Sequence, residues 1–223
     1  MRGAAMSLTF VVLLLTLPVM KGENGWQVTY TPPQICALKG STVIIHCSYT
    51  YPSTIYPVNP AEKRFWYTKE SNGVYVDLRM DPEYSGRVQY HCGNNLCTLT
   101  ITDLRESDSA EYYFRFLTSQ PDGRYTGVPG VTLSVTDLQV QVSRTEVHTS
   151  YIRAELKCHS SCHLPGPPLY IWYKNGQKMW PPQSHSFTDD IYDPASSYSC
   201  AVTGHENSSS PTVYAPQLPS VSV

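Results

Sequence analysis

The chain has 223 residues, which is enough for one or two domains of ordinary size. Apolar residues make up 41% of it and charged residues 15%, so it can bury a substantial core. A formal net charge of −2 excludes both a basic nucleic-acid-binding surface and an acidic disordered chain. The 17 tyrosines and 18 prolines favour short strands joined by turns over helices.

The first 22 residues have the pattern of a secretory signal peptide. Arg2 precedes an apolar run from Leu8 to Leu17, Pro18 ends the run, and Gly22 supplies a small residue at a plausible cleavage position. The run is shorter than the roughly 20 apolar residues that a membrane span needs, and no later stretch is apolar enough. We therefore expect an extracellular protein, either secreted or the outer part of a single-pass membrane protein whose span lies beyond this chain.

After the signal, apolar residues recur with period two, and no segment of useful length has helical periodicity. Clusters of Gly, Pro, Asn and Asp separate the alternating runs, as turns separate strands. The predicted strands of the first half are 41–48, 64–68, 74–78, 87–90, 97–102, 111–118 and 130–135. Those of the second half are 138–142, 154–159, 169–174, 197–202 and 212–214.

The second half has the cysteine and tryptophan spacing of an immunoglobulin domain. Cys158 on one predicted strand is followed by Trp172 on the next and by Cys200 on a later strand. Tyr198 lies two residues before Cys200, the position of a tyrosine corner. We expect a Cys158–Cys200 disulfide that joins two sheets across Trp172.

The first half has a modified version of the same pattern. Cys47 and Trp66 are in place, but the residue two after Tyr112, which should be the second cysteine, is Phe114. Cys97 is the expected replacement partner for Cys47, within one sheet rather than between two. Arg87 is expected to pair with Asp108, a structural ion pair of variable-type domains.

The sequence therefore predicts an all-β chain with two tandem immunoglobulin-like β-sandwiches. The signal peptide occupies residues 1–22, a variable-type domain 23–136, and a constant- or intermediate-type domain 137–214. Residues 215–223 have the composition of a linker.

All seven cysteines follow the signal peptide, so they indicate a disulfide framework with one thiol left over. Cys158 and Cys162, beside His159 and His163, have a spacing that can bind metal, but an exported chain favours disulfides there, and we expect no metal and no cofactor. No catalytic motif is present, so we expect no enzyme. Asn207 heads the single Asn-x-Ser/Thr sequence and is a candidate glycosylation site.

The most informative predicted strand is Tyr112-Tyr-Phe-Arg-Phe116. Period two directs Tyr112, Phe114 and Phe116 into the core and leaves Tyr113 and Arg115 on the outer face. A guanidinium has donors in a planar fork that matches a carboxylate. Arg115 is therefore a candidate anion-binding residue, the alternative being an ion pair with an acid on a neighbouring strand.

The first domain resembles the terminal domain of the siglecs, the sialic-acid-binding immunoglobulin-like lectins. The similarity covers about 110 residues. It lies in Trp26 near the mature N-terminus, in Gly-Ser-Thr-Val-Ile-Ile-His-Cys-Ser-Tyr-Thr-Tyr-Pro (40–52), in the displaced Cys97, and in the Phe-Arg-Phe that ends at Phe116. The resemblance implies that Arg115 binds the carboxylate of sialic acid.

The resemblance also implies further ligand-binding residues. Trp26 would flank Arg115, and Tyr125 would take the place of a second family tryptophan. Backbone groups over Asp122–Thr126, including those of Arg124 and Thr126, would hydrogen-bond the sugar. The segment 69–74 is where the family sets its linkage preference.

Cys162 resembles the extra siglec cysteine that bonds to the first domain. Its expected partner is Cys36, which leaves Cys92 over; the alternative is a Cys36–Cys92 bond with Cys162 free. The function implied is a cell-surface or secreted lectin that recognises sialylated glycans in leukocyte adhesion. The alternative is a receptor ectodomain that binds a protein partner through the same sheet face. We expect no nucleic-acid partner.

Overall fold

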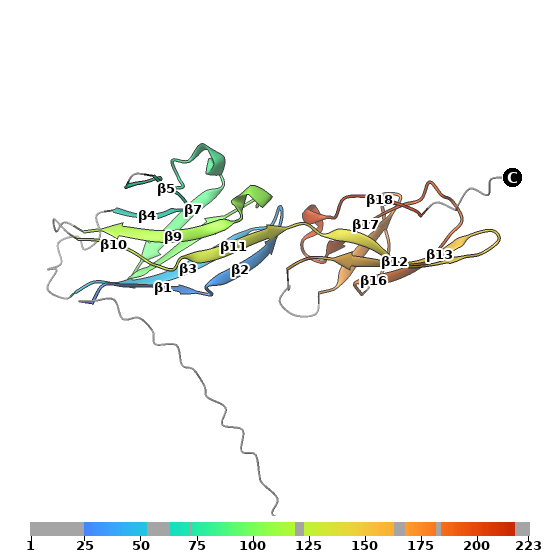
Figure 1. Ribbon diagram of the computed structural model, residues 1–223, viewed down its shortest axis with the longest axis horizontal. Coiled ribbons are helices and arrows are strands. Elements are labelled where there is room, and N and C mark those ends of the chain that lie inside the picture. The colour runs from blue at the N-terminus through green and yellow to red at the C-terminus, as the bar shows by residue number, and fades with distance from the viewer. Residues whose placement is uncertain are drawn as a thin grey trace, which may run out of the picture.

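The computed structural model describes residues 25–52, 63–71, 73–118, 123–162, 168–181 and 184–216. Two β-sandwiches follow each other along the long axis of the molecule (Figure 1). The signal peptide and the end of the linker-like segment lie outside the described residues. No helix in the described ranges is long and apolar enough to cross a membrane.

The first sandwich packs one four-stranded and one five-stranded sheet face to face. The four-stranded sheet is antiparallel, in the order β1 (Gln27–Thr31), β3 (Val43–Thr50), β8 (Leu96–Ile101) and β7 (Val88–Gly93). The other sheet has the order β10 (Arg124–Thr126), β9 (Ala110–Leu117), β11 (Val131–Thr136) and β2 (Gln34–Leu38), and β4 (Lys63–Tyr67) pairs with β9. Strands β2 and β11 are parallel. A small hairpin of β5 (Glu70–Ser71) and β6 (Val74–Tyr75) follows β4.

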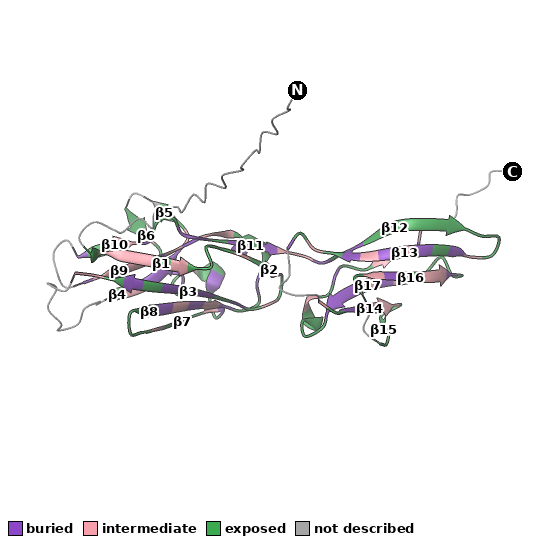
Figure 2. Cartoon of the chain, turned by 90° about the horizontal axis from the view of Figure 1, so that it is seen from below, coloured by how far each residue is buried: buried purple, intermediate pink, exposed green. Residues whose placement is uncertain are grey.

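The core of the first sandwich follows from the period-two pattern. Buried and exposed residues alternate through the whole of β3, and in β8 buried residues alternate with exposed or half-buried ones (Figure 2). Strand β9 places Tyr112, Phe114 and Phe116 in the core, each fully buried, as the alternation predicts. Trp66 packs against Phe114, with ring centroids 5.4 Å apart, where other immunoglobulin domains have a disulfide.

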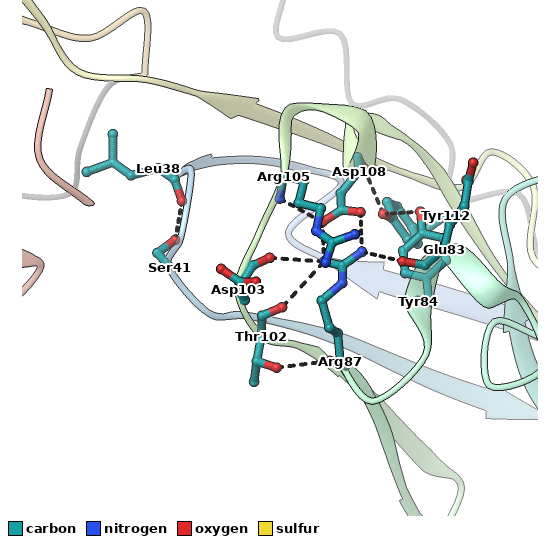
Figure 3. Close-up of polar contacts among 10 residues, drawn as sticks. All are labelled: Leu38, Ser41, Glu83, Tyr84, Arg87, Thr102, Asp103, Arg105, Asp108 and Tyr112. Carbon is teal, nitrogen blue, oxygen red and sulfur yellow. Dashed lines mark hydrogen bonds and ion pairs between the residues drawn. The ribbon is translucent and has the colours of Figure 1, made fainter. Parts of the chain in front are cut away.

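The ion pair expected between Arg87 and Asp108 is present and buried (Figure 3). Both guanidinium Nη atoms donate to the carboxylate, at 2.7 and 2.8 Å. Asp108 lies in the 3-10 turn η3 (Glu106–Asp108), just before β9, and the Tyr112 hydroxyl donates to its carbonyl oxygen at 2.7 Å. The pair and this tyrosine corner together fix the start of β9. A second 3-10 turn, η2, spans Pro82–Tyr84.

The second sandwich has a three-stranded sheet, β12 (Gln139–Val147), β13 (Ile152–His159) and β16 (Ser186–Ile191). It packs against β15 (Gln177–Lys178), β14 (Tyr170–Lys174), β17 (Ser197–Val202) and β18 (Val213–Tyr214); the turn η4 spans Glu206–Ser208. The Cys158–Cys200 disulfide joins β13 to β17, and so joins the two sheets beside the buried Trp172. Tyr198 does not form the expected corner with a backbone group, because its hydroxyl donates to the Asp189 carboxylate at 2.6 Å.

The two sandwiches are connected covalently and by polar contacts. Strand β11 ends at Thr136 and β12 begins at Gln139. The expected Cys36–Cys162 disulfide links β2 to the second sandwich across 126 residues of sequence. Lys39, just after β2, pairs with Asp137 in the connection at 3.3 Å. The direction in which the first sandwich points is therefore restrained at two places.

The expected Cys47–Cys97 bond is not formed. Cys97 lies in the central strand β8, opposite Cys47 on β3 and opposite Cys92 on β7, and its sulfur can bond only one of them. The disulfide is Cys92–Cys97, within the four-stranded sheet, and Cys47 is a buried free thiol. Cys92 is thus not the odd cysteine, and the alternative Cys36–Cys92 bond is wrong as well.

Candidate functional site

Arg115 lies in the middle of β9, on the face that points away from the core. The outer residues of this strand are half-buried and alternate with the fully buried aromatic residues. Strand β4 lies on one side of Arg115 and β10 on the other, because Phe65 and Thr126 are its two cross-strand partners. The guanidinium therefore rises from a sheet face between two strands rather than from a loop.

Two uncharged residues of the described part of the chain, Thr126 and Tyr75, contact the Arg115 guanidinium. Nη1 donates to the Thr126 hydroxyl at 2.7 Å, and Cζ lies 4.1 Å from the centroid of the Tyr75 ring. Among the described residues no carboxylate lies within ion-pair distance of Arg115, whereas Arg87, Arg79 and Arg153 each bind an aspartate. The described residues therefore contain no ion pair between Arg115 and an acid on a neighbouring strand, which was the alternative.

Three tyrosines form a continuous aromatic surface next to Arg115. The Tyr75 ring meets Tyr67 edge-on at 4.9 Å, and Tyr67 stacks on Tyr113 at 5.2 Å. Burial raises the pKa of Tyr67, and a hydrogen bond with Thr126 and the charge of Arg115 oppose that rise. Burial, with a hydrogen bond to Glu111, raises the pKa of Tyr113 to about 12. The raised pKa values keep the Tyr67 and Tyr113 hydroxyls neutral at physiological pH, so these two residues add no negative charge near the guanidinium.

Two further cations lie on the same face. Lys63 on β4 and Arg124 on β10 are both cross-strand partners of Leu117, which is one pleat from Arg115. Both side chains are exposed, and the Lys63 ammonium lies 5.1 Å from the Phe65 ring centroid. The positive groups at this end of the sheet favour an anionic ligand.

The structure does not bring Trp26 and Tyr125 to the Arg115 face. Tyr125 is the cross-strand partner of Phe116, so its side chain points to the core side. Trp26 stacks on Phe116 at 5.6 Å and on Tyr125 at 6.2 Å, and both rings are partly buried against the core cluster. For Tyr125, period two decides this outcome, because residues 125 and 126 of one strand must face opposite ways.

The aromatic neighbour of Arg115 is therefore Tyr75, which the sequence pattern did not single out. The available signal was the alternation of Val74, Tyr75 and Val76, with two exposed valines around a half-buried ring. That pattern predicts which way a ring points along its own strand. It does not predict which strand of the sheet the ring will cover.

Strand β10 is a free edge. The Thr118 amide donates to the Gly123 carbonyl at 2.6 Å and the Gly127 amide to the Phe114 carbonyl at 3.1 Å. Backbone groups alternate in direction along a strand, so those of Arg124 and Thr126 point away from β9. No described strand pairs with β10 on that side. Asp122, the first residue of the expected sugar-binding segment, lies outside the described residues.

Two other expectations concern residues away from this face. Asn207 is exposed, in η4 beside the domain connection, where a glycosylating enzyme can reach it. Cys158 and Cys162 belong to two different disulfides. The described residues contain no cluster of three or more His, Cys, Asp or Glu side chains that could hold a metal ion.

Residues 37–138 match the domain family described as "B-cell receptor CD22-like, first Ig-like". The chain is 25% identical over 193 residues to sialic acid-binding Ig-like lectin 5 of Homo sapiens; the match covers 77% of this chain and 34% of that protein, so the chain spans about a third of the relative's length. Among solved structures it is similar to a chimeric titin Z1Z2 carrying a KLER peptide from decorin (17% identity, 85% of this chain and 96% of that one, TM-score 0.38). It is also similar to titin Z1Z2 in complex with telethonin (17%, 84% and 94%, 0.36). The family match and the human relative support membership of the siglec family, with immunoglobulin-like domains.

Proposed function

We propose that the first sandwich is a lectin domain that binds sialylated glycans, and that Arg115 receives the carboxylate of the terminal sialic acid. The observation that carries the proposal is a half-buried guanidinium on a sheet face that has no acidic partner among the described residues. A planar carboxylate is the partner that such a fork matches best. The relative's name describes it as binding sialic acid, which supports the same ligand class here.

The other expected residues take different parts in this proposal. Thr126 orients Arg115, and the outward backbone groups of Arg124 and Thr126 are available to a sugar along the β10 edge. Asp122 is proposed as part of that edge. Trp26 and Tyr125 support the site from the core side, because their stack on Phe116 holds β10 against β9.

Binding of a single glycan should be weak. Hydrogen bonds to charged groups contribute about 1.5–3 kcal/mol, and a millimolar dissociation constant corresponds to about −4.1 kcal/mol. Clustering of the chain on a surface can raise the apparent affinity by roughly 10²–10⁴. The proposed role is therefore multivalent recognition of sialylated surfaces, either by a secreted protein or by the outer part of a membrane-anchored one.

The test is binding of clustered 23–223 to a panel of sialylated glycans, wild type beside Arg115→Ala. Arg144→Ala is the matched control, because Arg144 is an exposed arginine on the second sandwich. The proposal expects binding that Arg115→Ala and sialidase treatment both abolish and that Arg144→Ala leaves intact. Wild-type protein that binds no sialoside would overturn it.

A protein ligand is the second candidate. It is favoured by the apolar rim of the same face, where Val74 and Val76 on the β6 segment are 63% and 44% exposed. Exposed apolar side chains next to a polar anchor are typical of protein interfaces. Binding to target cells that survives sialidase treatment would favour this candidate over the lectin.

A further inference from the structure

Tyr75 is placed so that it controls the orientation of Arg115. It lies at the end of the β5–β6 hairpin, which stands over the outer face of the sheet beside β4 (Figure 1). Its ring centroid is 4.1 Å from Cζ of Arg115, the distance of a guanidinium stacked on an aromatic ring. No other described aromatic ring lies over this guanidinium.

The Tyr75 ring is itself held in place. Tyr67, buried on β4, contacts it edge-on, and Tyr113 backs Tyr67 in turn. The hairpin that carries Tyr75 is closed by a hydrogen bond from the Gly73 amide to the Glu70 carboxylate at 2.9 Å. Glu70 and Tyr75 are cross-strand partners, so this turn fixes the backbone position of Tyr75. The sheet residues therefore support the Tyr75 ring, and the ring supports the Arg115 guanidinium.

Stacking and hydrogen bonding restrain the guanidinium in complementary ways. Cζ of Arg115 lies over the Tyr75 ring, 4.1 Å from its centroid, and the Thr126 hydroxyl accepts from Nη1. The other donors of the fork lie in its plane and stay available for two parallel hydrogen bonds. A carboxylate that accepts from these donors approaches in the plane of the guanidinium, because the N–H groups point in that plane.

We propose that Tyr75 is a positioning residue: by stacking on Arg115 it holds the guanidinium fork ready for in-plane, two-point binding of a ligand carboxylate. This inference rests on the proposed function for the identity of the ligand. The restraint on Arg115 is a property of the free protein, and it is measurable without a ligand. A side chain that is ordered before binding loses less entropy when the ligand arrives.

The test compares Tyr75→Leu, which removes the ring, with Tyr75→Phe, which keeps the ring and removes only the hydroxyl. Binding of clustered sialosides should weaken by about 5- to 30-fold in Tyr75→Leu, the range that a cation–π contact supports, and Tyr75→Phe should restore most of it. Tyr214→Leu, an exposed tyrosine of the second sandwich, is the control. In an Arg115→Lys background the Tyr75→Leu change should have no further effect, because lysine has no planar fork to hold.

A ligand-free measurement separates this inference from the proposed function. Nitrogen-15 relaxation of the Arg115 side-chain Nε should report a rigid group in wild type and Tyr75→Phe and a mobile one in Tyr75→Leu. An Arg115 that is equally rigid in Tyr75→Leu, or sialoside binding that is unchanged in that variant, would overturn the positioning role. Wild type that binds no sialoside but loses Arg115 order in Tyr75→Leu would overturn only the proposed ligand.

Discussion

The buried ion pair between Arg87 and Asp108 should be one of the most sensitive points of the first sandwich (Figure 3). The two side chains are 8% and 3% exposed, and the guanidinium also donates to the carbonyl oxygens of Asp103 at 3.0 Å and Glu83 at 2.9 Å. The Asp108 carboxylate accepts a further bond from the Arg105 amide at 2.8 Å. Asp108→Asn keeps the shape but leaves the arginine buried without its counter-charge.

Removing one partner of a buried ion pair costs about 3–5 kcal/mol. That is a large part of the 5–15 kcal/mol by which a domain is typically stable. At roughly 4 °C or more per kcal/mol, the unfolding transition of the first sandwich should fall by about 12 °C or more. The measurement is urea and thermal unfolding of each sandwich in wild type and in Asp108→Asn.

The second sandwich supplies a matched control. Arg153 and Asp190 form the same two-point contact, at 2.7 and 2.9 Å, but the side chains are 47% and 34% exposed. Asp190→Asn should cost only about 0.2–1 kcal/mol, because exposed pairs contribute little. Equal losses in the two variants, both below about 1 kcal/mol, would refute the argument that burial sets the difference.

Three further outcomes are expected. Gly127→Ala should destabilise the first sandwich by about 1–3 kcal/mol, because a Cβ there would lie 2.5 Å from the Tyr30 hydroxyl, whereas Gly93→Ala meets nothing and is the control; equal melting temperatures would contradict this. Loss of the Cys36–Cys162 bond, which closes 126 residues, should leave both sandwiches folded and widen the distribution of domain orientations in small-angle scattering; an unchanged distribution would mean that the polar contacts suffice. Because the folded pKa of Tyr113 is raised to about 12, its stabilising contribution should be complete below pH of about 10 and disappear as the pH rises through about 12; the free energy of unfolding by urea should fall over this range, and a constant value would contradict this.

The fold could be predicted from the sequence because its determinants are local. Trp172 and the two cysteines that flank it in sequence identify the second sandwich, and the alternation along β9 places three aromatic residues in the core. Strands β1 and β2 were not predicted. Each has five residues, Pro32 and Pro33 separate them, and they join different sheets, so neither has a long period-two run.

The candidate site could be predicted only in part, because its missing parts depend on contacts distant in sequence. The outward direction of the Arg115 side chain follows from the alternation of side chains along one strand. The position of Trp26 depends instead on how the N-terminal segment packs on Phe116, which no local pattern determines. The Cys97 sulfur has two cysteines opposite it, on β3 and on β7, and the spacing of cysteines in the sequence does not determine which of them it bonds.

Two arginines of the first sandwich show why the surroundings, rather than the residue type, separate structure from function. Arg87 binds a carboxylate and several carbonyl oxygens of its own chain through both Nη atoms, so its charge is paired and stabilises the fold. Arg115 contacts Thr126 and Tyr75 instead, and those contacts leave its charge without a counter-ion among the described residues. A charge without a counter-ion contributes little to folding, and it stays available to an anionic ligand. The ion pair at Asp108 thus fixes the start of β9, and the contact with Tyr75 fixes the Arg115 guanidinium that projects from β9.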